Sequence, residues 1–437
     1  MTVGGSVRKG LRGVMALVLL AVMAAVVFGC GSGSKSAGTP QVGTGDSGKA
    51  VELRFLFPEY SDKTKGLMQQ VVDDFNTENK GKVHVTLETA PWDKLHDKLA
   101  VTMGGNQAAD VFGFATRWVS EFSELGQLEP LDSYLTGAFK DQFISRLLEA
   151  SVYTPKATGK QATFGLPVAA SARMLFYRKD LFDKAGLKAP TNWDELLDAA
   201  KKTSAPPNVY GLGVPASGIE VDTFFMYFLW NNGGDILGPN GKAVINNTQG
   251  VEALDFLVKL VNEKGSELKP TGFTREQIIE MFKAGQLSMY PTGPWLNTMI
   301  QRDNPKLAYA VAPFPVNKGK TAATVGVTDS LGLWAKGTHK QEAWKFVQFM
   351  YQDKYRQKFD EVEAMLPEKK GVATSAAFST PDLKPFVDAL NNAKFVPHHP
   401  KFENIQQIIT VAVQKALTGE STPKQALDEA AQKIDAL

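Results

Sequence analysis

Short apolar runs and helix-period stripes alternate along the chain from residue 51 onward. Residues 51–57 (VELRFLF), 83–89 (VHVTLET) and 110–114 (DVFGF) have the apolar or alternating pattern of strands. Between them, residues 65–79 and 92–103 carry apolar side chains at helical spacing. This β-α-β-α-β order predicts an α/β domain with a largely parallel sheet.

A second α/β set begins near residue 163. Residues 222–230 (DTFFMYFLW) are so rich in aromatic residues that they predict a buried helix. The remaining pattern predicts strands or extended segments at 163–168, 173–177, 287–290, 307–312 and 324–335. It predicts further helices at 191–203, 246–265, 274–284, 340–359, 382–391, 405–417 and 422–434. Three of these begin with predicted capping boxes, at Thr191/Asp194, Thr274/Gln277 and Thr422/Gln425.

The beginning of the chain has the pattern of an export signal. Arg8, Lys9 and Arg12 precede an uninterrupted apolar run at 14–28. At about 1.5 Å per residue that run reaches roughly 22 Å, which is less than a bilayer core of roughly 30 Å. We therefore predict a signal peptide at 1–29, and an uncleaved membrane anchor is the alternative.

Cys30 follows the apolar run directly, and the arrangement resembles a bacterial lipoprotein signal. In that interpretation Cys30 becomes the first residue and is acylated, and two acyl chains suffice for stable anchoring. The alternative is an ordinary signal peptide with an incidental cysteine. Residues 30–50 are dominated by Gly, Ser, Thr and Pro, which predicts a flexible tether with a reach of about 25 Å.

Composition sets the broad class. The 437 residues are 43% hydrophobic and 22% charged, as in soluble globular proteins of two or three domains. Lys and Arg total 48 against 46 Asp and Glu; removing residues 1–29 takes away three cations and leaves 45 against 46. A nearly neutral body does not indicate a nucleic-acid partner. One cysteine excludes a disulfide framework and a cysteine-ligated metal site within the chain.

Common catalytic motifs are absent from the sequence. It contains no Gly-x-Ser-x-Gly, no His-Glu-x-x-His and no P-loop. Residues 211–216 fit a dinucleotide fingerprint only formally, because Pro215 interrupts the helix that the fingerprint requires. We expect a protein that is not an enzyme and has no cofactor or metal; a secreted glycosidase using two carboxylates remains the enzyme alternative.

A series of spaced motifs resembles a known family. Their residues are 165–167 (GLP), 175–182 (LFYRKDLF), 184–187 (KAGL), 193–197 (WDELL), 231–235 (NNGGD), 282–285 (FKAG), 293–295 (GPW), 312–315 (APFP), 343–347 (AWKFV) and 422–428 (TPKQALD). In this order they are similar to the extracellular solute-binding proteins of family 1, the maltose-binding-protein-like receptors of ABC importers. The resemblance covers residues 51–434.

The resemblance implies a two-lobe α/β fold of the periplasmic-binding-protein type II, with a ligand cleft between the lobes. We expect lobe 1 at 51–168 plus 327–366 and lobe 2 at 169–326 plus 367–437. It also implies a monomeric receptor that binds a sugar or oligosaccharide and delivers it to a membrane permease. A receptor for a glycerol phosphodiester or a polyol is the alternative, and an anionic solute would need Arg117 and Arg173.

Candidate ligand-binding residues are sought just after each strand, because α/β proteins bind ligands beyond the carboxyl ends of strands. A sugar needs aromatic platforms and a few placed polar groups. From position alone we predict Glu59, Tyr60, Arg173 and Asp222. With the resemblance we add Trp92, Arg117, Trp118, Ser171, Trp295, Asp329 and His399. Trp295 is expected in a turn and as a stacking face. Core packing, surface ion pairs and solvent-facing loops are the alternative roles for these residues.

Overall fold

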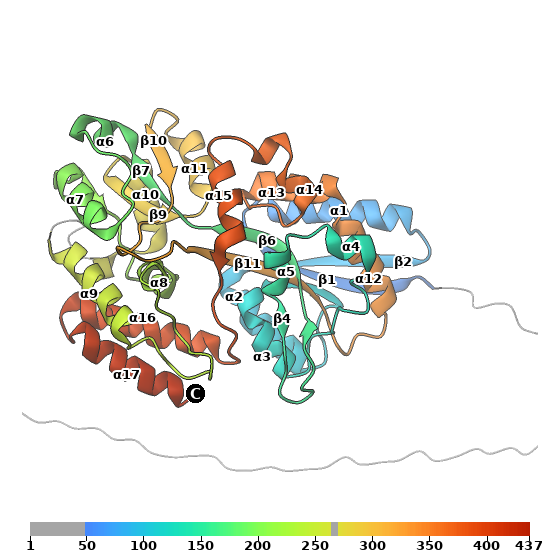
Figure 1. Cartoon of the computed structure of the whole chain (residues 1–437). Helices are drawn as coiled ribbons and strands as arrows, with labels where there is room; N and C mark the ends of the chain where they lie inside the picture. Colours follow the sequence, from blue (N-terminus) through green and yellow to red (C-terminus); the bar gives the residue numbers. More distant parts are fainter. Residues whose placement is uncertain (1–48, 264–269) are drawn as a thin grey trace, which may run out of the picture. The chain divides into compact units, whose positions relative to one another are not determined.

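Figure 1 shows the computed structural model of the chain, which describes residues 49–263 and 270–437. The predicted signal peptide at 1–29, Cys30 and the tether up to Gly48 lie outside the described residues. No helix in the described ranges combines the length and apolar character needed to cross a bilayer. The described residues, from Lys49 onward, belong to one compact unit.

The first sheet contains the predicted β-α-β-α-β segment. Strand β1 (Val51–Glu59) pairs in parallel with β2 (Val83–Pro91) and with β3 (Val111–Ala115). Helices α1 (Thr64–Glu78) and α2 (Trp92–Gly104) make the two connections. Alternation in the first half of β2, where valines are buried and polar residues exposed, follows from one face lying on the core. The predicted α/β segment is confirmed.

Strand β11 (Thr324–Leu333) joins this parallel set to two later strands. It pairs antiparallel with β3 and with β6 (Leu166–Ala172), and in parallel with the short β12 (Ala393–Lys394). The register with β6 shifts between Asp329 and Ser330. The six-stranded sheet is therefore mixed, with parallel and antiparallel pairs.

The second sheet has four strands in the order β10-β7-β9-β8. Their bounds are β10 (Tyr309–Ala312), β7 (Met174–Arg178), β9 (Leu287–Thr292) and β8 (Tyr210–Leu212). Because β6 ends at Ala172 and β7 begins at Met174, the chain passes from the first sheet to the second at Arg173. This position places Arg173 where the two sheets meet along the chain.

Each sheet has its own buried apolar clusters. The cluster around the second sheet includes helices α7 (Trp193–Thr203), α8 (Val221–Asn231), α9 (Thr248–Asn262), α16 (Phe402–Thr418) and α17 (Pro423–Asp435). Two further clusters lie on the first sheet, one including α1 residues and the other including α2 residues. Every residue of α8 is buried, which confirms the predicted buried helix.

Shorter elements complete the described chain. The helices are α3 (Val119–Glu124), α4 (Gly137–Asp141), α5 (Ser145–Glu149), α6 (Lys179–Ala185), α10 (Arg275–Lys283), α11 (Trp295–Asp303), α12 (Lys340–Met350), α13 (Asp353–Glu363), α14 (Lys370–Ala373) and α15 (Lys384–Ala389). Strands β4 (Val152–Tyr153) and β5 (Ala162–Thr163) pair with each other, and 3-10 turns lie at 116–118, 270–272, 376–378 and 390–392.

Three local predictions were wrong. The helix predicted at 340–359 is two helices, α12 and α13, because Gln352 has an extended backbone between them. The first predicted capping box is displaced by one residue: Asn192 caps α7 by accepting from the Glu195 N–H. Trp295 begins α11 instead of lying in a turn. The boxes at Thr274/Gln277 and Thr422/Gln425 are confirmed.

Candidate functional site

Three aromatic side chains meet at the carboxyl ends of the parallel strands. Tyr60 follows β1, Trp92 follows β2 and Trp118 follows β3. The Tyr60 and Trp92 rings contact edge-to-face with centroids 5.3 Å apart, and the Trp92 and Trp118 centroids are 6.3 Å apart. Parallel strands bring their carboxyl ends to one sheet edge, which is why residues far apart in sequence converge here. Glu59, in contrast, accepts a hydrogen bond from the Thr89 hydroxyl on β2, at 2.6 Å.

Asp329 connects this aromatic group to strand β11. Its Oδ2 accepts a hydrogen bond from the Tyr60 hydroxyl at 2.8 Å, beside the register shift with β6. Burial raises the pKa of Asp329 to about 7, against the Tyr60 hydrogen bond and the charges of Arg117 and Arg173. Near neutral pH this carboxyl group is therefore partly protonated.

Glu403 connects the two sheets through side chains. It lies in the first turn of α16, whose residues pack in the cluster of the second sheet, whereas Trp118 packs in a cluster of the first. The Glu403 Oε1 accepts from Arg117 Nε and from Trp118 Nε1, each at 2.7 Å. We call this arrangement the Glu403 bridge. In this bridge Glu403 bonds the indole N–H of Trp118, and the Trp118 side chain is buried.

Arg173, between the two sheets, is held by several contacts at once. It is 3% exposed and donates to Ser171 Oγ at 2.8 Å and to Glu220 Oε1 at 3.0 Å. Its guanidinium carbon lies 4.5 Å from the ring centroid of Trp295, which is a cation–π distance. Among the described residues its buried Nε has no hydrogen-bond partner.

Glu220 serves two arginines. Its Oε1 also lies 3.1 Å from Arg275 Nη1, and its backbone has φ of 65°, a region uncommon for residues with a side chain. Burial raises the pKa of Glu220, but the charges of Arg173 and Arg275 together hold it below its usual value. Glu220 is therefore the shared anionic partner of both guanidinium groups.

Asp222 lies two residues further on, in the first turn of α8. It is 2% exposed, and its Oδ1 accepts from Gln406 Nε2 on α16 at 3.1 Å. Burial raises its pKa to about 6, against the charge of Arg117 and hydrogen bonds from Thr223 and Gln406. The charge of Arg117 thus acts on Asp222, Glu220 and Asp329 together, so groups from both sheets lie within electrostatic reach of one another.

Trp295 is half-buried and held in place by its neighbours. A Cβ at Gly293 would lie 2.1 Å from the Trp295 ring, so only glycine permits the ring to take this position. The Arg173 guanidinium lies against the Trp295 ring, so a ligand can contact only the part of the ring that stays exposed. His399 makes a local contact: its Nδ1 accepts from the Lys401 N–H at 3.1 Å, and burial lowers its pKa.

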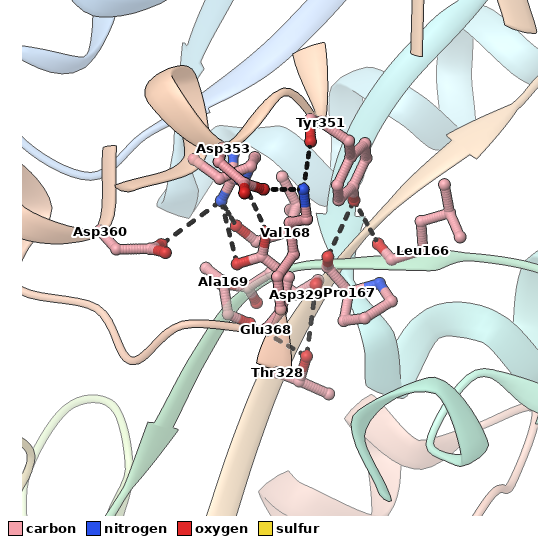
Figure 2. A network of polar contacts seen from close by, with 12 residues as sticks. Leu166, Pro167, Val168, Ala169, Thr328, Asp329, Tyr351, Asp353, Asp360 and Glu368 are labelled. Carbon is pink, nitrogen blue, oxygen red and sulfur yellow. Dashed lines mark hydrogen bonds and ion pairs between the residues drawn. The ribbon is translucent and has the colours of Figure 1, made fainter. Parts of the chain in front are cut away.

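A buried polar network holds the strand that leads to Ser171 and Arg173 (Figure 2). The carbonyls of β6 accept from side chains: Val168 from Arg356, Pro167 from the Tyr351 hydroxyl at 2.8 Å, and Ala169 from the Thr328 hydroxyl at 3.0 Å.

Arg356 is the centre of this network. It is 1% exposed and donates through Nε to Glu368 Oε1 at 2.7 Å, and Asp360 lies beside it. Burial and the nearby Glu368 raise the pKa of Asp360 well above its usual value. Lys369 donates to the Tyr351 carbonyl and to the Asp353 carboxylate. These bonds fix the direction in which β6 enters the site.

The sequence identified most of the residues in this cluster and missed several of their partners. Of the predicted residues, the structure joins Tyr60, Trp92, Arg117, Trp118, Ser171, Arg173, Asp222, Trp295 and Asp329 through the contacts above. The missed residues are Glu220, Arg275, Glu403 and Gln406. An acidic residue in the first turn of a helix was the only signal for Glu403, and no sequence pattern marked the others.

Metal ligation has no support in the part of the chain that the structure describes. Residues 49–263 and 270–437 hold no group of three or more His, Cys, Asp or Glu side chains arranged to bind a metal ion. The groups that converge are instead aromatic rings, carboxylates and guanidinium groups. Such a set can contact the faces and the hydroxyl groups of a polar organic molecule.

Matches to known proteins agree with this arrangement. The sequence profile of the family "Bacterial extracellular solute-binding protein" matches residues 60–357. A Brucella abortus (strain 2308) protein, named as a predicted binding protein without a ligand, is 36% identical over 404 residues, or 92% of this chain and 97% of the relative. The multiple sugar-binding protein of Streptococcus mutans is 24% identical over 328 residues, covering 72% of this chain and 75% of the relative.

A solved structure shows the same fold. An ABC transporter solute-binding protein from Thermotoga lettingae, bound with alpha-D-tagatose, has a TM-score of 0.77 and 26% identity, covering 89% of this chain and 99% of that one. The predicted two-lobe α/β fold of the periplasmic-binding-protein type II is thereby confirmed. The chain belongs to the bacterial extracellular solute-binding protein family, whose members bind their solutes outside the cytoplasm.

Proposed function

We propose that this protein binds a sugar or short oligosaccharide between its two lobes and delivers it, unchanged, to the permease of an ABC importer. The observation that carries the proposal is the meeting of three aromatic rings, those of Tyr60, Trp92 and Trp118, near carboxylates from both sheets. A fourth ring, that of Trp295, lies against Arg173. The named ligands of two relatives, multiple sugars and tagatose, support it. For the lobes we propose 51–168 plus 327–366 and 169–326 plus 367–437.

The chemistry of a sugar fits these groups. Its C–H faces pack against aromatic rings, and its hydroxyl groups donate to carboxylates such as Asp222 and Asp329. Each aromatic contact is worth roughly 0.5–1.5 kcal/mol beyond area burial, and each hydrogen bond roughly 1 kcal/mol. A few of each suffice for micromolar affinity, which is about −8 kcal/mol. Binding of this kind requires no reactive group.

Closure of the lobes couples binding to delivery. A ligand that touches groups on both sheets makes all of its contacts only when the lobes are closed, so it stabilises the closed state. The Glu403 bridge contributes to the same state with protein atoms alone. The permease then meets one distinct shape when the receptor is loaded.

The charges of the site weigh against the alternative of an anionic solute. Arg117 and Arg173, the two cations which that alternative required, are each already paired with a carboxylate, Glu403 and Glu220. An uncharged polyol remains compatible with the same groups. The family that matches the chain consists of binding proteins, which does not favour the alternative of a secreted carbohydrate-active enzyme.

The attachment to the membrane belongs to the same proposal. We propose that Cys30 is acylated after removal of residues 1–29 and that the tether holds the receptor near its permease. Mass spectrometry of the mature N-terminus tests this directly, with Cys30→Ala as the matched control. An unmodified Cys30 in the membrane fraction would contradict lipid anchoring.

The sugar assignment is tested by a thermal-shift screen of mono- and oligosaccharides, followed by calorimetry on the hits. A ligand at a hundred times its Kd adds about 2.7 kcal/mol to the free energy of unfolding, which is a clear shift. We expect at least one saccharide to bind and to be recovered unchanged. Chemically altered saccharides would reject the receptor function, and binding of non-sugar solutes alone would reject the substrate class.

A further inference from the structure

The charged groups of the site are unevenly paired. Three guanidinium groups, those of Arg117, Arg173 and Arg275, pair with three carboxylates: Glu220 pairs with Arg173 and Arg275, Glu276 also pairs with Arg275, and Glu403 pairs with Arg117. Asp222 and Asp329 are two further carboxylates. Their direct side-chain partners are neutral, the Gln406 amide and the Tyr60 hydroxyl. With every group ionised these residues hold three positive and five negative charges.

The hydrogen-bonding groups are uneven in the same sense. Asp222 and Asp329 offer carboxylate oxygens, which accept and cannot donate when ionised. Among the described residues, the buried Nε of Arg173 has no hydrogen-bond partner, and Arg117 uses only its Nε to bond Glu403. A hydroxyl group can donate to the carboxylates and also accept from Arg173 Nε. A carboxylate or phosphate on a ligand can only accept, and would face Asp222 and Asp329 without a proton to share.

Arg173, the most deeply buried cation of the site, is not free to compensate an added negative charge. Arg173 is buried and its guanidinium lies against Trp295, so it cannot turn away from Glu220 to meet a ligand without losing both contacts.

From this balance we propose that the receptor selects uncharged hydroxylated solutes and rejects their anionic analogues. The inference rests on the proposed ligand site and adds a charge rule to it. Hexose phosphates, uronates and glycerol phosphate fall in the rejected class. Hexoses, uncharged oligosaccharides and polyols fall in the accepted class.

The test is calorimetry at pH 8, above the pKa values of about 7 for Asp329 and about 6 for Asp222. Each neutral sugar that binds is compared with its uronate and with the corresponding uronamide, which has nearly the same bulk and no charge. Glycerol and glycerol phosphate form a second pair. We expect the uronate to bind at least about a hundredfold more weakly than the uronamide, equivalent to about 2.7 kcal/mol.

Each outcome separates the two proposals. A uronate within tenfold of its uronamide overturns the charge rule even if sugars bind well. Tight binding of glycerol phosphate or a sugar phosphate overturns it as well. Binding of neutral polyols but of no sugar supports the charge rule and rejects the sugar assignment.

Substitutions test whether Asp222 and Asp329 cause the preference for uncharged ligands. In the double variant Asp222→Asn with Asp329→Asn, we expect the uronamide-to-uronate preference to fall at least tenfold. Asp73→Asn, an exposed aspartate on α1, is the matched control and leaves the preference unchanged. An unchanged preference in the double variant contradicts the role of these two carboxylates. The wild-type comparison stands independently if the double variant does not fold.

Discussion

The Glu403 bridge is expected to set part of the affinity for the ligand, because it joins the two sheets through protein atoms. Substituting Glu403→Ala removes the acceptor for both Arg117 Nε and Trp118 Nε1. The Arg117 and Glu403 side chains are 34% and 35% exposed, so their ion pair is worth at most about 1 kcal/mol. Trp118 is 4% exposed, and leaving its N–H unpaired costs about 1–3 kcal/mol.

The combined loss is about 2 kcal/mol, and it falls on the closed arrangement of the lobes. If ligand binding requires closure, the Kd rises by the same free energy, which is roughly 30-fold. Glu403→Gln keeps an acceptor for Trp118 and loses only the charge, so we expect a several-fold smaller effect. Glu429→Ala is the control, since Glu429 pairs with Lys433 on its own helix and with Lys415 on the adjacent α16.

Calorimetry with the tightest saccharide measures the Kd of each variant, and small-angle scattering without ligand measures the mean separation of the lobes. We expect the radius of gyration of Glu403→Ala to exceed that of the wild type, and ligand to restore it. If Glu403→Ala binds within twofold of the wild type and has the same scattering profile, the bridge does not contribute to closure and the reasoning is refuted.

Three further predictions follow from the same site. Trp295→Ala is expected to weaken saccharide binding by at least about tenfold, because it removes an aromatic face and the support of Arg173; titration calorimetry decides this, and an unchanged Kd would remove Trp295 from the site. Lowering the pH from 8 to 5 is expected to weaken binding, because Asp329 and Asp222, with pKa values of about 7 and about 6, become protonated and are then poorer acceptors. The effect of these two groups on folding stability has the opposite pH dependence. Burial raises both pKa values above the usual 3.8, so the protonated groups favour the native state at low pH, and this contribution to the free energy of unfolding is lost as the pH rises through 6 and 7. For ligand binding, a pH series of Kd values should show one step near pH 7 and one near pH 6, and Asp329→Asn should remove the step near pH 7. Arg356→Met is expected to lower the free energy of unfolding by about 3–5 kcal/mol, since it leaves the buried Glu368 without its cation. Urea unfolding measures this, and the exposed Arg302→Met should leave the midpoint unchanged.

Much of the fold followed from local pattern. Alternation in β2 and the apolar stripes of α1 and α2 are short-range properties, and they predicted both the elements and their order. The rule that ligands lie beyond the carboxyl ends of strands then located Tyr60 without any contact information, and the family resemblance added Trp118. Both residues belong to the cluster described above.

The partners of these residues could not be predicted in the same way. Glu403 lies 286 positions from Arg117, and Asp329 lies 269 positions from Tyr60. Such pairs depend on how two sheets pack, which local spacing does not report. Tyr351, at the end of α12, likewise donates its hydroxyl to carbonyls of β6, a contact that local spacing does not report.

The sequence by itself determined the α/β alternation, the aromatic and carboxylate residues available to a ligand, and the family, because these depend on side-chain chemistry and short-range period. Only the tertiary structure decided which charges neutralise one another. The pairing of Arg117 with Glu403, and of Arg173 and Arg275 with Glu220, turned cations that could have held an anion into fixed parts of the protein. The physical reason is that an ion pair depends on distances of a few ångströms between segments that are remote in the chain.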